Sequence, residues 1–483
     1  MSLGSLRVAA AAVVLSVVSS VPAVAATLAA ELDGLLADHP QVAADRASVG
    51  ARGEGQREAF ARFLPTLNVD ADAGYERTDS PGRRAAGREP LSASRYSSSV
   101  EVRQNVFDGF ESTALRQIAK TDRDIAEQTL RATRQAVMLE GVAAYLDVLR
   151  HAELVKLANR NVSNIREQMQ LEDERVQRGS GIAVDVLLAK SRLQIALERK
   201  VAFERAFNTA VTQYTQVFGH PPVVAEMHLP PQPMADFPAA LPDAEGAVLA
   251  DNPAVQAGQL RSESANHARD VAAAGDLPLV DLVAGGNFEK NVDGVSGIRR
   301  DYGLRVEFRW ELFSGFATQA RKARRAHEYN AARSQSRFVE RKATEEVRFA
   351  WYELNAAADR RELLFNAVNI AGEVFDFRKQ LRDAGQESAI NVLDAENELY
   401  NVCINFLNAE FDARILRHRV LRAMGRLTPA VFGLRDDDDA TDKMTTDTVA
   451  ADKTAEDLKT STSSTVMAAA EGGTIDGAKA CGL

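Results

Sequence analysis

One segment of the chain alternates apolar and charged residues so regularly that it predicts a β-strand. It runs from Tyr302 to Leu312, and every second residue from position 305 onward is charged: Arg305, Glu307, Arg309 and Glu311. Because side chains alternate between the two faces of a strand, this segment has one apolar face and one charged face. Together with the residues before it, it predicts a β-hairpin at about residues 278–313.

A second hairpin is predicted at about residues 66–107, where the same alternation is seen. Val100 and Val102 lie on the face opposite Glu101 and Arg103. Aromatic residues collect at both ends of the predicted strands, as in the two aromatic girdles of a transmembrane barrel. The alternative is the sheet of a soluble protein, with one solvent-exposed face. The dense charged face, and the lack of a further strand near each hairpin, favour the barrel.

The sequence also predicts a long helix after each hairpin. A proline-free segment of nearly 70 residues follows each hairpin, which is roughly 100 Å of helix at 1.5 Å per residue. Gly179 and Gly385 end these segments, and a shorter return helix follows each one. Pro65 and Pro278 end the helices that precede the hairpins. The six predicted helices span 29–60, 109–177, 183–218, 243–274, 316–383 and 389–425.

The second return helix carries a continuous heptad pattern. All ten of its first and fourth heptad positions are apolar: Val392, Ala395, Leu399, Val402, Phe406, Ala409, Ala413, Leu416, Val420 and Ala423. In the first return helix only Lys200 breaks the same pattern. This periodicity predicts coiled-coil packing. A plain coiled coil would explain the heptads but not the strands.

The two halves of the chain are copies of one another. VEVRQNVFDGF at 100–110 matches VEFRWELFSGF at 306–316, and the same offset of 206 residues still holds at Gly219 and Gly425. We infer an internal duplication. The first repeat covers 26–220 and the second covers 243–433, with a proline-rich linker at 221–242 between them.

Both ends of the chain differ from the repeats. Arg7, an apolar run and Ala23-Val24-Ala25 predict a secretory signal at 1–25, against the alternative of a buried core helix. There is no cysteine near the cleavage site, so nothing supports a lipid-anchored mature N-terminus. Residues 434–483 predict a disordered tail, since from residue 436 onward they carry 11 acidic residues, four lysines and no aromatic residue.

Composition excludes several classes of function. The net charge of −10 argues against nucleic acid as a partner. Two cysteines, Cys403 in a heptad helix and Cys481 in the tail, rule out a disulfide framework or a cysteine-rich zinc module. The chain has no zinc-protease motif and no phosphate-binding loop. We therefore predict neither an enzyme nor a cofactor or metal site.

The hairpins also predict self-association. One chain supplies four strands, whereas the smallest closed membrane barrels have about eight. An open edge in lipid leaves unpaired backbone groups, each costing several kcal/mol. Several chains must therefore share one barrel.

The repeats resemble the TolC-type outer-membrane channel family over residues 27–433. The resemblance rests on the duplication, on FLPTL at 63–67, on GSGIAVDVLL at 179–188 and on NVLDAENELYN at 391–401, which is similar to type I secretion members. It implies a mainly α fold with a membrane β-barrel: a homotrimer with a 12-stranded barrel on an α-helical tunnel. It also implies an outer-membrane location, with the helices in the periplasm, and docking to an adaptor and an inner-membrane ABC or other transporter.

The resemblance further implies a periplasmic aperture at the helix tips. Asp394 falls where acidic side chains of three protomers form a ring, Asn391 where members can carry a second aspartate, and Asp185 at the corresponding place in the first repeat. Glu387 stands where members can have a latching arginine, so the latch here must differ or be absent. The predicted tips and partner contacts are Gly179, Gly181, Gly385 and Glu387, and the predicted barrel lumen is lined by Glu101, Arg103, Arg305, Glu307, Arg309 and Glu311.

These residues predict passive conduction through a charged constriction. Two kinds of cargo fit this prediction: protein, in a type I secretion system, and drugs or metals, in an efflux system. Two other classes compete with the channel: a secreted structural coiled coil without a pore, and a periplasmic adaptor. The first has no use for a charged lumen, and the second lacks the duplication.

Overall fold

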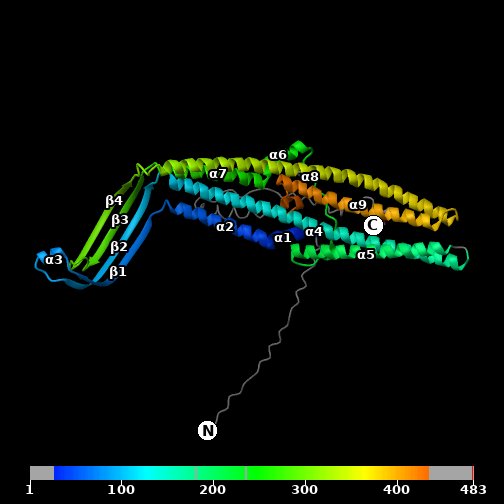
Figure 1. Cartoon of the computed structure of the whole chain (residues 1–483), viewed down its shortest axis with the longest axis horizontal. Helices are drawn as coiled ribbons and strands as arrows, with labels where there is room; N and C mark the ends of the chain where they lie inside the picture. Colours follow the sequence, from blue (N-terminus) through cyan, green and yellow to red (C-terminus); the bar gives the residue numbers. More distant parts are fainter. Residues whose placement is uncertain (1–26, 180–181, 234–236, 435–480, 482–483) are drawn as a thin grey trace, which may run out of the picture.

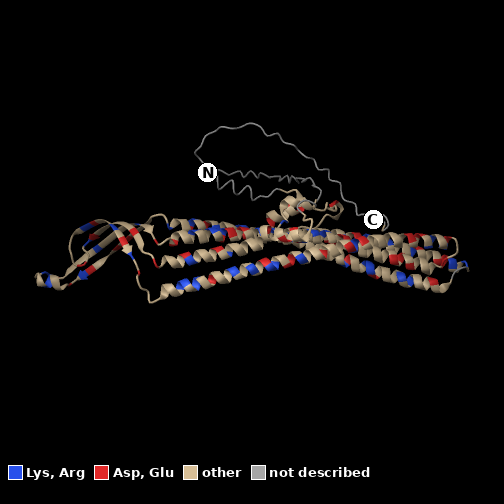
Figure 2. Ribbon diagram, turned by 90° about the horizontal axis from the view of Figure 1, so that it is seen from above, with Lys and Arg blue, Asp and Glu red and all other residues tan. Residues whose placement is uncertain are grey.

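The computed structural model of the protein describes residues 27–179, 182–233, 237–434 and 481. The predicted signal sequence and residues 435–480 and 482–483 of the predicted tail lie outside the described residues. Figure 1 shows an elongated molecule with a β-sheet at one end and long helices that run away from it. Charged residues of both signs are spread along these helices (Figure 2).

The long helices confirm the sequence prediction. Helices α4 (Glu111–Gln177) and α8 (Ala317–Asp383) have 67 residues each. Their return helices, α5 (Ala183–Phe218) and α9 (Ala389–Met424), pack back along them. None of the ten apolar heptad residues of α9 is exposed, because α9 packs against α8 on one side and α4 on another.

The helices that precede the hairpins are each interrupted, which the sequence analysis missed. The first is divided into α1 (Leu28–Asp38) and α2 (Pro40–Ala61), the other into α6 (Leu241–Asp251) and α7 (Pro253–Ala274). A proline disfavours helical backbone in the residue before it, and His39 and Asn252 are both extended. The prediction of continuous helices is therefore wrong at these two residues.

The four strands form one antiparallel sheet. Its order is β1 (Thr66–Thr78), β2 (Leu91–Phe107), β3 (Leu279–Lys290) and β4 (Ile298–Arg309), so the hairpins of the two repeats lie side by side. A short helix, α3 (Pro81–Ala85), lies between β1 and β2. Arg103 is opposite Val283, and Val283 is opposite Arg305, so the charged residues of β2 and β4 share one face.

The largest core lies where the short helices and the linker meet the long ones. Tyr145 of α4, Tyr214 of α5 and Phe406 of α9 are fully buried there. The Tyr145 hydroxyl donates to the carbonyl of His228 at 3.0 Å, so the linker is bound to α4. The linker also contains a short 3-10 helix, η1 (Val224–Glu226), and a second one, η2 (Pro429–Phe432), follows α9.

The two cysteines, assigned from the sequence to a heptad helix and to a separate tail, are joined in a disulfide. Cys403 of α9 is bonded to Cys481, with 5.9 Å between their Cα atoms. Both are buried and belong to the largest core. The pairing could not be predicted because the two residues lie 78 positions apart, one in a helix and the other near the end of the acidic segment.

Buried His418 of α9 predicts a loss of stability in acid. Its Nδ1 lies 2.8 Å from the Arg414 carbonyl and its ring is stacked on Phe432. Burial lowers the pKa of this imidazole from 6.5 to about 4. Below pH 6.5 the unfolded chain binds a proton that the folded chain excludes, so stability falls by about 1.4 kcal/mol per pH unit down to about pH 4.

Thermal unfolding of the wild type and of His418→Gln, each at pH 7.5 and pH 5, checks this prediction. The variant cannot titrate at position 418, so we expect its melting temperature to fall less than that of the wild type. Equal falls in the two proteins would show that His418 does not carry the effect.

Candidate functional site

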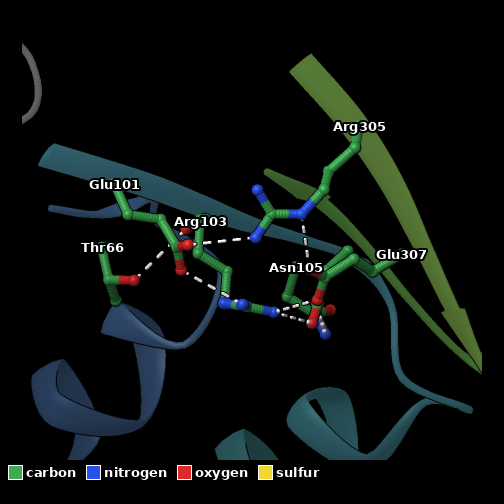
Figure 3. Close-up of polar contacts among 7 residues, drawn as sticks. Thr66, Glu101, Arg103, Asn105, Arg305 and Glu307 are labelled. Carbon is green, nitrogen blue, oxygen red and sulfur yellow. Dashed lines mark hydrogen bonds and ion pairs between the residues drawn. The ribbon is translucent and has the colours of Figure 1, made fainter. Parts of the chain in front are cut away.

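Charged residues on one face of the sheet form a network centred on Arg103. Its guanidinium donates to Glu307 at 2.8 Å, to Asp281 at 3.1 Å and to Glu101 at 3.1 Å. Arg305 completes the network, because it donates to Glu307 at 2.8 Å and to Glu101 at 3.1 Å (Figure 3). Three strands thus contribute charges of alternating sign, at the end of the sheet that joins the helices.

Four of the six predicted lumen residues are therefore brought together: Glu101, Arg103, Arg305 and Glu307. Arg309 is the last residue of β4, and Glu311 lies beyond the strand, so the prediction that Glu311 belongs to the strand's charged face is wrong. The sequence analysis missed Asp281, which is only 8% exposed. Its neighbours in β3 are mostly apolar or glycine, and no charge alternation marked it.

The opposite face of the sheet is apolar and exposed. The large side chains on it include Leu67, Val69, Tyr75, Val100, Val102, Leu304, Val306 and Phe308. Such a contiguous apolar surface is characteristic of contact with lipid or another protein. The sheet thus has the two unlike faces that a membrane barrel requires.

At the far end of the helices, glycines form the two tips. Gly179 follows α4 with φ of +77°, and Gly385 follows α8 with φ of +75°. Next to Gly385, the N–H of Gln386 donates to the Leu381 carbonyl at 2.9 Å, which closes the end of α8. Gly181 lies outside the described residues.

Glu387 and Asn391 interact with each other inside the second tip. The Glu387 carboxylate accepts from the Asn391 side-chain amide and from the N–H of Ser388. These hydrogen bonds lower the pKa of Glu387, the bond from Asn391 most strongly. Arg378 of α8 donates to the Asn391 carbonyl at 3.3 Å. Glu387 thus stabilises its own turn.

Asp394 is paired with an arginine of the other repeat. Arg192 of α5 donates to its carboxylate and, at 3.5 Å, to the Leu393 carbonyl. Seven residues further along both helices, Arg199 donates to the Asn401 side chain at 3.0 Å. The two contacts join α5 to α9, and so connect the two coiled-coil pairs of the protomer.

A third contact between the pairs is buried. Arg382, near the end of α8, donates to Glu172 and to Gln168 of α4. The side chains of Arg382 and Glu172 are 6% and 5% exposed. We name the contacts Arg192–Asp394, Arg199–Asn401 and Arg382–Glu172 the tip contacts. Asp185, by contrast, lies half-buried in the first turn of α5.

Heptad spacing is the one feature of the sequence that points to the tip contacts. Arg192 and Arg199 are seven residues apart, and so are Asp394 and Asn401, which places each pair on one helix face. The pairing itself joins residues more than 200 positions apart, so it required knowledge of which helices are neighbours.

In the part of the chain that the structure describes, no group of three or more His, Cys, Asp or Glu side chains could hold a metal ion. Nor does any described helix contain a stretch long and apolar enough to span a membrane.

Comparison with known proteins gives consistent matches. A family model described as outer membrane efflux protein matches residues 32–220 and 246–426. Outer membrane efflux protein BepC of Brucella suis is 25% identical over 436 residues, which cover 88% of this chain and 91% of BepC. Outer membrane protein TolC of Escherichia coli is 24% identical over 410 residues, or 80% of each chain.

The fold matches as well. The Campylobacter jejuni CmeC outer membrane channel has a TM-score of 0.71 at 14% identity, over 86% of this chain and 88% of CmeC. This likeness confirms the predicted architecture of a helical tunnel with a barrel. The relatives are channel proteins, which confirms that the chain is not an enzyme. The chain belongs to the outer membrane efflux protein family, as an exit duct in the outer membrane of a Gram-negative bacterium with its helical part in the periplasm.

Proposed function

We propose that three copies of the chain form one duct that carries protein cargo of a type I secretion system out of the cell. The observation that carries this proposal is the sheet, with a charged network on one face and exposed apolar residues on the other. Three such sheets make a 12-stranded barrel in which the network of Arg103 lines the lumen. Within the described residues β1 and β4 each have one neighbouring strand, so both edges are available to other protomers.

Exposed heptad residues on α8 support the same assembly. Leu363, Ile370 and Phe377 recur every seven residues, and all three are at least 63% exposed. Val374 and Leu381, four residues after two of these, are also exposed. On α5, at the other side of the protomer, Val184, Leu187, Ile195 and Val201 are exposed. The exposed heptad residues of α8 form a coiled-coil surface that would be covered by α5 of the next protomer.

The aperture lies at the tips, where Asp394 of three protomers would surround one axis. In the closed state Arg192 holds each carboxylate to α5. Opening moves the α8/α9 pair away from the α4/α5 pair, and therefore breaks the tip contacts. The sequence contains no phosphate-binding loop, so the energy comes from an inner-membrane transporter that docks with its periplasmic adaptor.

Single-channel conductance in a planar bilayer tests the duct and the aperture together. We expect discrete, cation-selective openings from the wild type, and altered conductance and selectivity from Asp394→Ala. Glu398→Ala is the matched control, because it removes an exposed carboxylate one turn further along α9. If Asp394→Ala leaves the conductance and selectivity unchanged, the constriction lies elsewhere, and Asp185→Ala is the next variant. A folded protein without pores would overturn the duct.

The type I assignment rests on the segment 391–401 and on one relative. The alkaline protease secretion protein AprF of Pseudomonas aeruginosa is 22% identical over 373 residues. Efflux of drugs or metals is the second candidate, favoured by the names of the family and of BepC. Expression with a type I transporter, in cells that lack their own exit duct, separates the two. Cargo in the medium supports secretion, whereas restored drug resistance alone supports efflux.

A further inference from the structure

The apolar face of the sheet carries three cations, all at the end away from the long helices, where Figure 1 shows α3. They are Arg77 in β1, Lys290 in β3 and Arg300 in β4, and we name them the rim cations. All three are exposed. Lys290 is opposite Tyr96 and Arg300 is opposite Phe288. At the helix end of this face, none of the four described strands carries a charged residue.

No carboxylate of the sheet shares a face with the rim cations. The register places every acidic residue of the four described strands on the charged face: Asp70, Asp72, Glu76, Glu101, Asp281, Glu289, Asp301 and Glu307. Cations on that face have acidic partners, such as Arg95 with Asp72 at 3.1 Å and Arg299 with Asp301 at 2.8 Å. Among the described residues, by contrast, no acidic side chain forms an ion pair with a rim cation.

Aromatic rings orient two of the rim cations. The Nζ atom of Lys290 lies 5.9 Å from the ring centre of Tyr96, and the guanidinium carbon of Arg300 lies 5.9 Å from that of Phe288. Such contacts hold a cation in place but leave its charge available. Lys290 is opposite Ile298, two residues before Arg300, and diagonal neighbours of this kind are about 7–8 Å apart. Two long side chains at this spacing can bind one phosphate group together.

Hydrogen bonds between the two hairpins fix this end of the sheet. Asn291, in the loop between β3 and β4, donates to the Ser94 carbonyl of β2 at 3.0 Å. Arg83 of α3 donates to the Gly294 carbonyl of the same loop at 2.6 Å. The longer loop of the first hairpin is thus bound to the shorter loop of the second. The rim cations of β3 and β4 flank this shorter loop, so their backbone positions are set before any ligand binds.

We propose that the rim cations bind the phosphate groups of lipid headgroups in the outer leaflet of the membrane. The helices lie in the periplasm, so the opposite end of the sheet faces the cell exterior. The proposal rests on the proposed barrel for one point, that the apolar face is turned towards lipid. A cation at the edge of an apolar band extends towards the headgroup region. There it attracts anionic lipid, and phosphate supplies the negative charge that the sheet lacks on this face.

Native mass spectrometry of the full-length protein in detergent measures this binding. Delipidated protein is mixed with lipid A that carries both its phosphates, or with the same lipid after its phosphates have been removed. We expect the wild type to bind the phosphorylated form far better. Each cation near an anionic lipid surface strengthens binding about fivefold, so the double variant Lys290→Gln/Arg300→Gln should bind lipid A about 25-fold more weakly.

Two control variants test whether charge on this face is responsible. Arg299→Gln removes the neighbouring cation of β4, which is also exposed but lies on the charged face beside Asp301, and it should bind lipid A as the wild type does. Lys290→Arg/Arg300→Lys keeps both charges and should also bind. If the double glutamine variant does not fold, its two single variants, each about fivefold weaker, decide the question.

Three results would overturn the lipid site. One is equal binding of lipid A by the wild type and the folded double variant. Another is equal binding of both lipids by the wild type, because the contact would then be with acyl chains alone. The third is displacement of lipid A by equimolar inorganic phosphate, which would make free phosphate the ligand.

Single-channel conductance separates the lipid site from the duct. The double glutamine variant should form pores of wild-type conductance, because both residues lie on the face away from the lumen. Wild-type pores from protein that does not bind lipid A would overturn the lipid site and leave the duct. Folded wild-type protein that binds lipid A but forms no pores would overturn the duct and leave the lipid site.

Discussion

Replacement of Arg382 by methionine is expected to open the periplasmic end of the duct and to destabilise the tip. The substitution leaves the carboxylate of Glu172 buried without its principal partner, which costs about 3–5 kcal/mol in comparable buried pairs. It also removes one of the tip contacts that joins α8 to α4. The conductance of the variant should therefore rise strongly, and its melting temperature should fall strongly.

A double variant separates the two effects. With Arg382→Met and Glu172→Met together, no charge is left buried, and apolar replacement of a buried pair is often neutral or stabilising. We expect this protein to melt near the wild-type temperature and still to conduct more. Arg175→Met is the matched control, because Arg175 also lies beside Glu172, at 3.5 Å, but is 47% exposed. Equal conductance in all the variants and the wild type would rule out a latch at Arg382.

The helical half of the fold could be predicted because its signals are local. Gly179 and Gly385 mark the tips, and the heptads of α9 mark its buried face, all within a few residues of the feature that they determine. The breaks at His39 and Asn252 had a local signal as well, the proline that follows each of them. That signal is weaker than the surrounding composition, which favours a continuous helix.

The candidate site was less predictable because its contacts join distant residues. Glu101 and Arg305 were recognised from alternation, but Asp281 was not, since its importance comes from the register between β2 and β3. Likewise, Asp394 was singled out by resemblance, whereas its partner Arg192 lies 202 positions away. Periodicity places a residue on a face of its own helix or strand. It does not show which residue of another element lies opposite.

The equivalent glycines at the ends of the two return helices also have neighbours that their sequence positions do not reveal. Gly219 and Gly425 occupy equivalent positions, both with positive φ, +79° and +84°. Their surroundings differ. No atom lies within 4 Å of a Cβ built on Gly219, whereas a Cβ on Gly425 would overlap the Asp251 carbonyl and lie 2.6 Å from the Asn252 Cα. The end of α9 is thus docked on the break between α6 and α7.

Several hydrogen bonds hold the chain at this junction. The Gly425 carbonyl accepts from Gln135 of α4 at 2.7 Å, and Asn252 donates to the Ala423 carbonyl at 2.8 Å. An added methyl group cannot be relieved by a side-chain rotation, because the atoms that it meets belong to the backbone. The junction would have to separate, and these hydrogen bonds would be lost with it.

Gly425→Ala should therefore destabilise the protein much more than Gly219→Ala. The left-handed backbone alone costs about 1–2 kcal/mol for alanine, and this is the whole expected effect at Gly219. Overpacking adds about 1–3 kcal/mol at Gly425, for a total of about 2–5 kcal/mol. Chemical unfolding of the two variants in the same detergent measures the difference. Equal losses would mean that α9 is not docked on the α6–α7 break, and that the two repeats end alike despite their different neighbours.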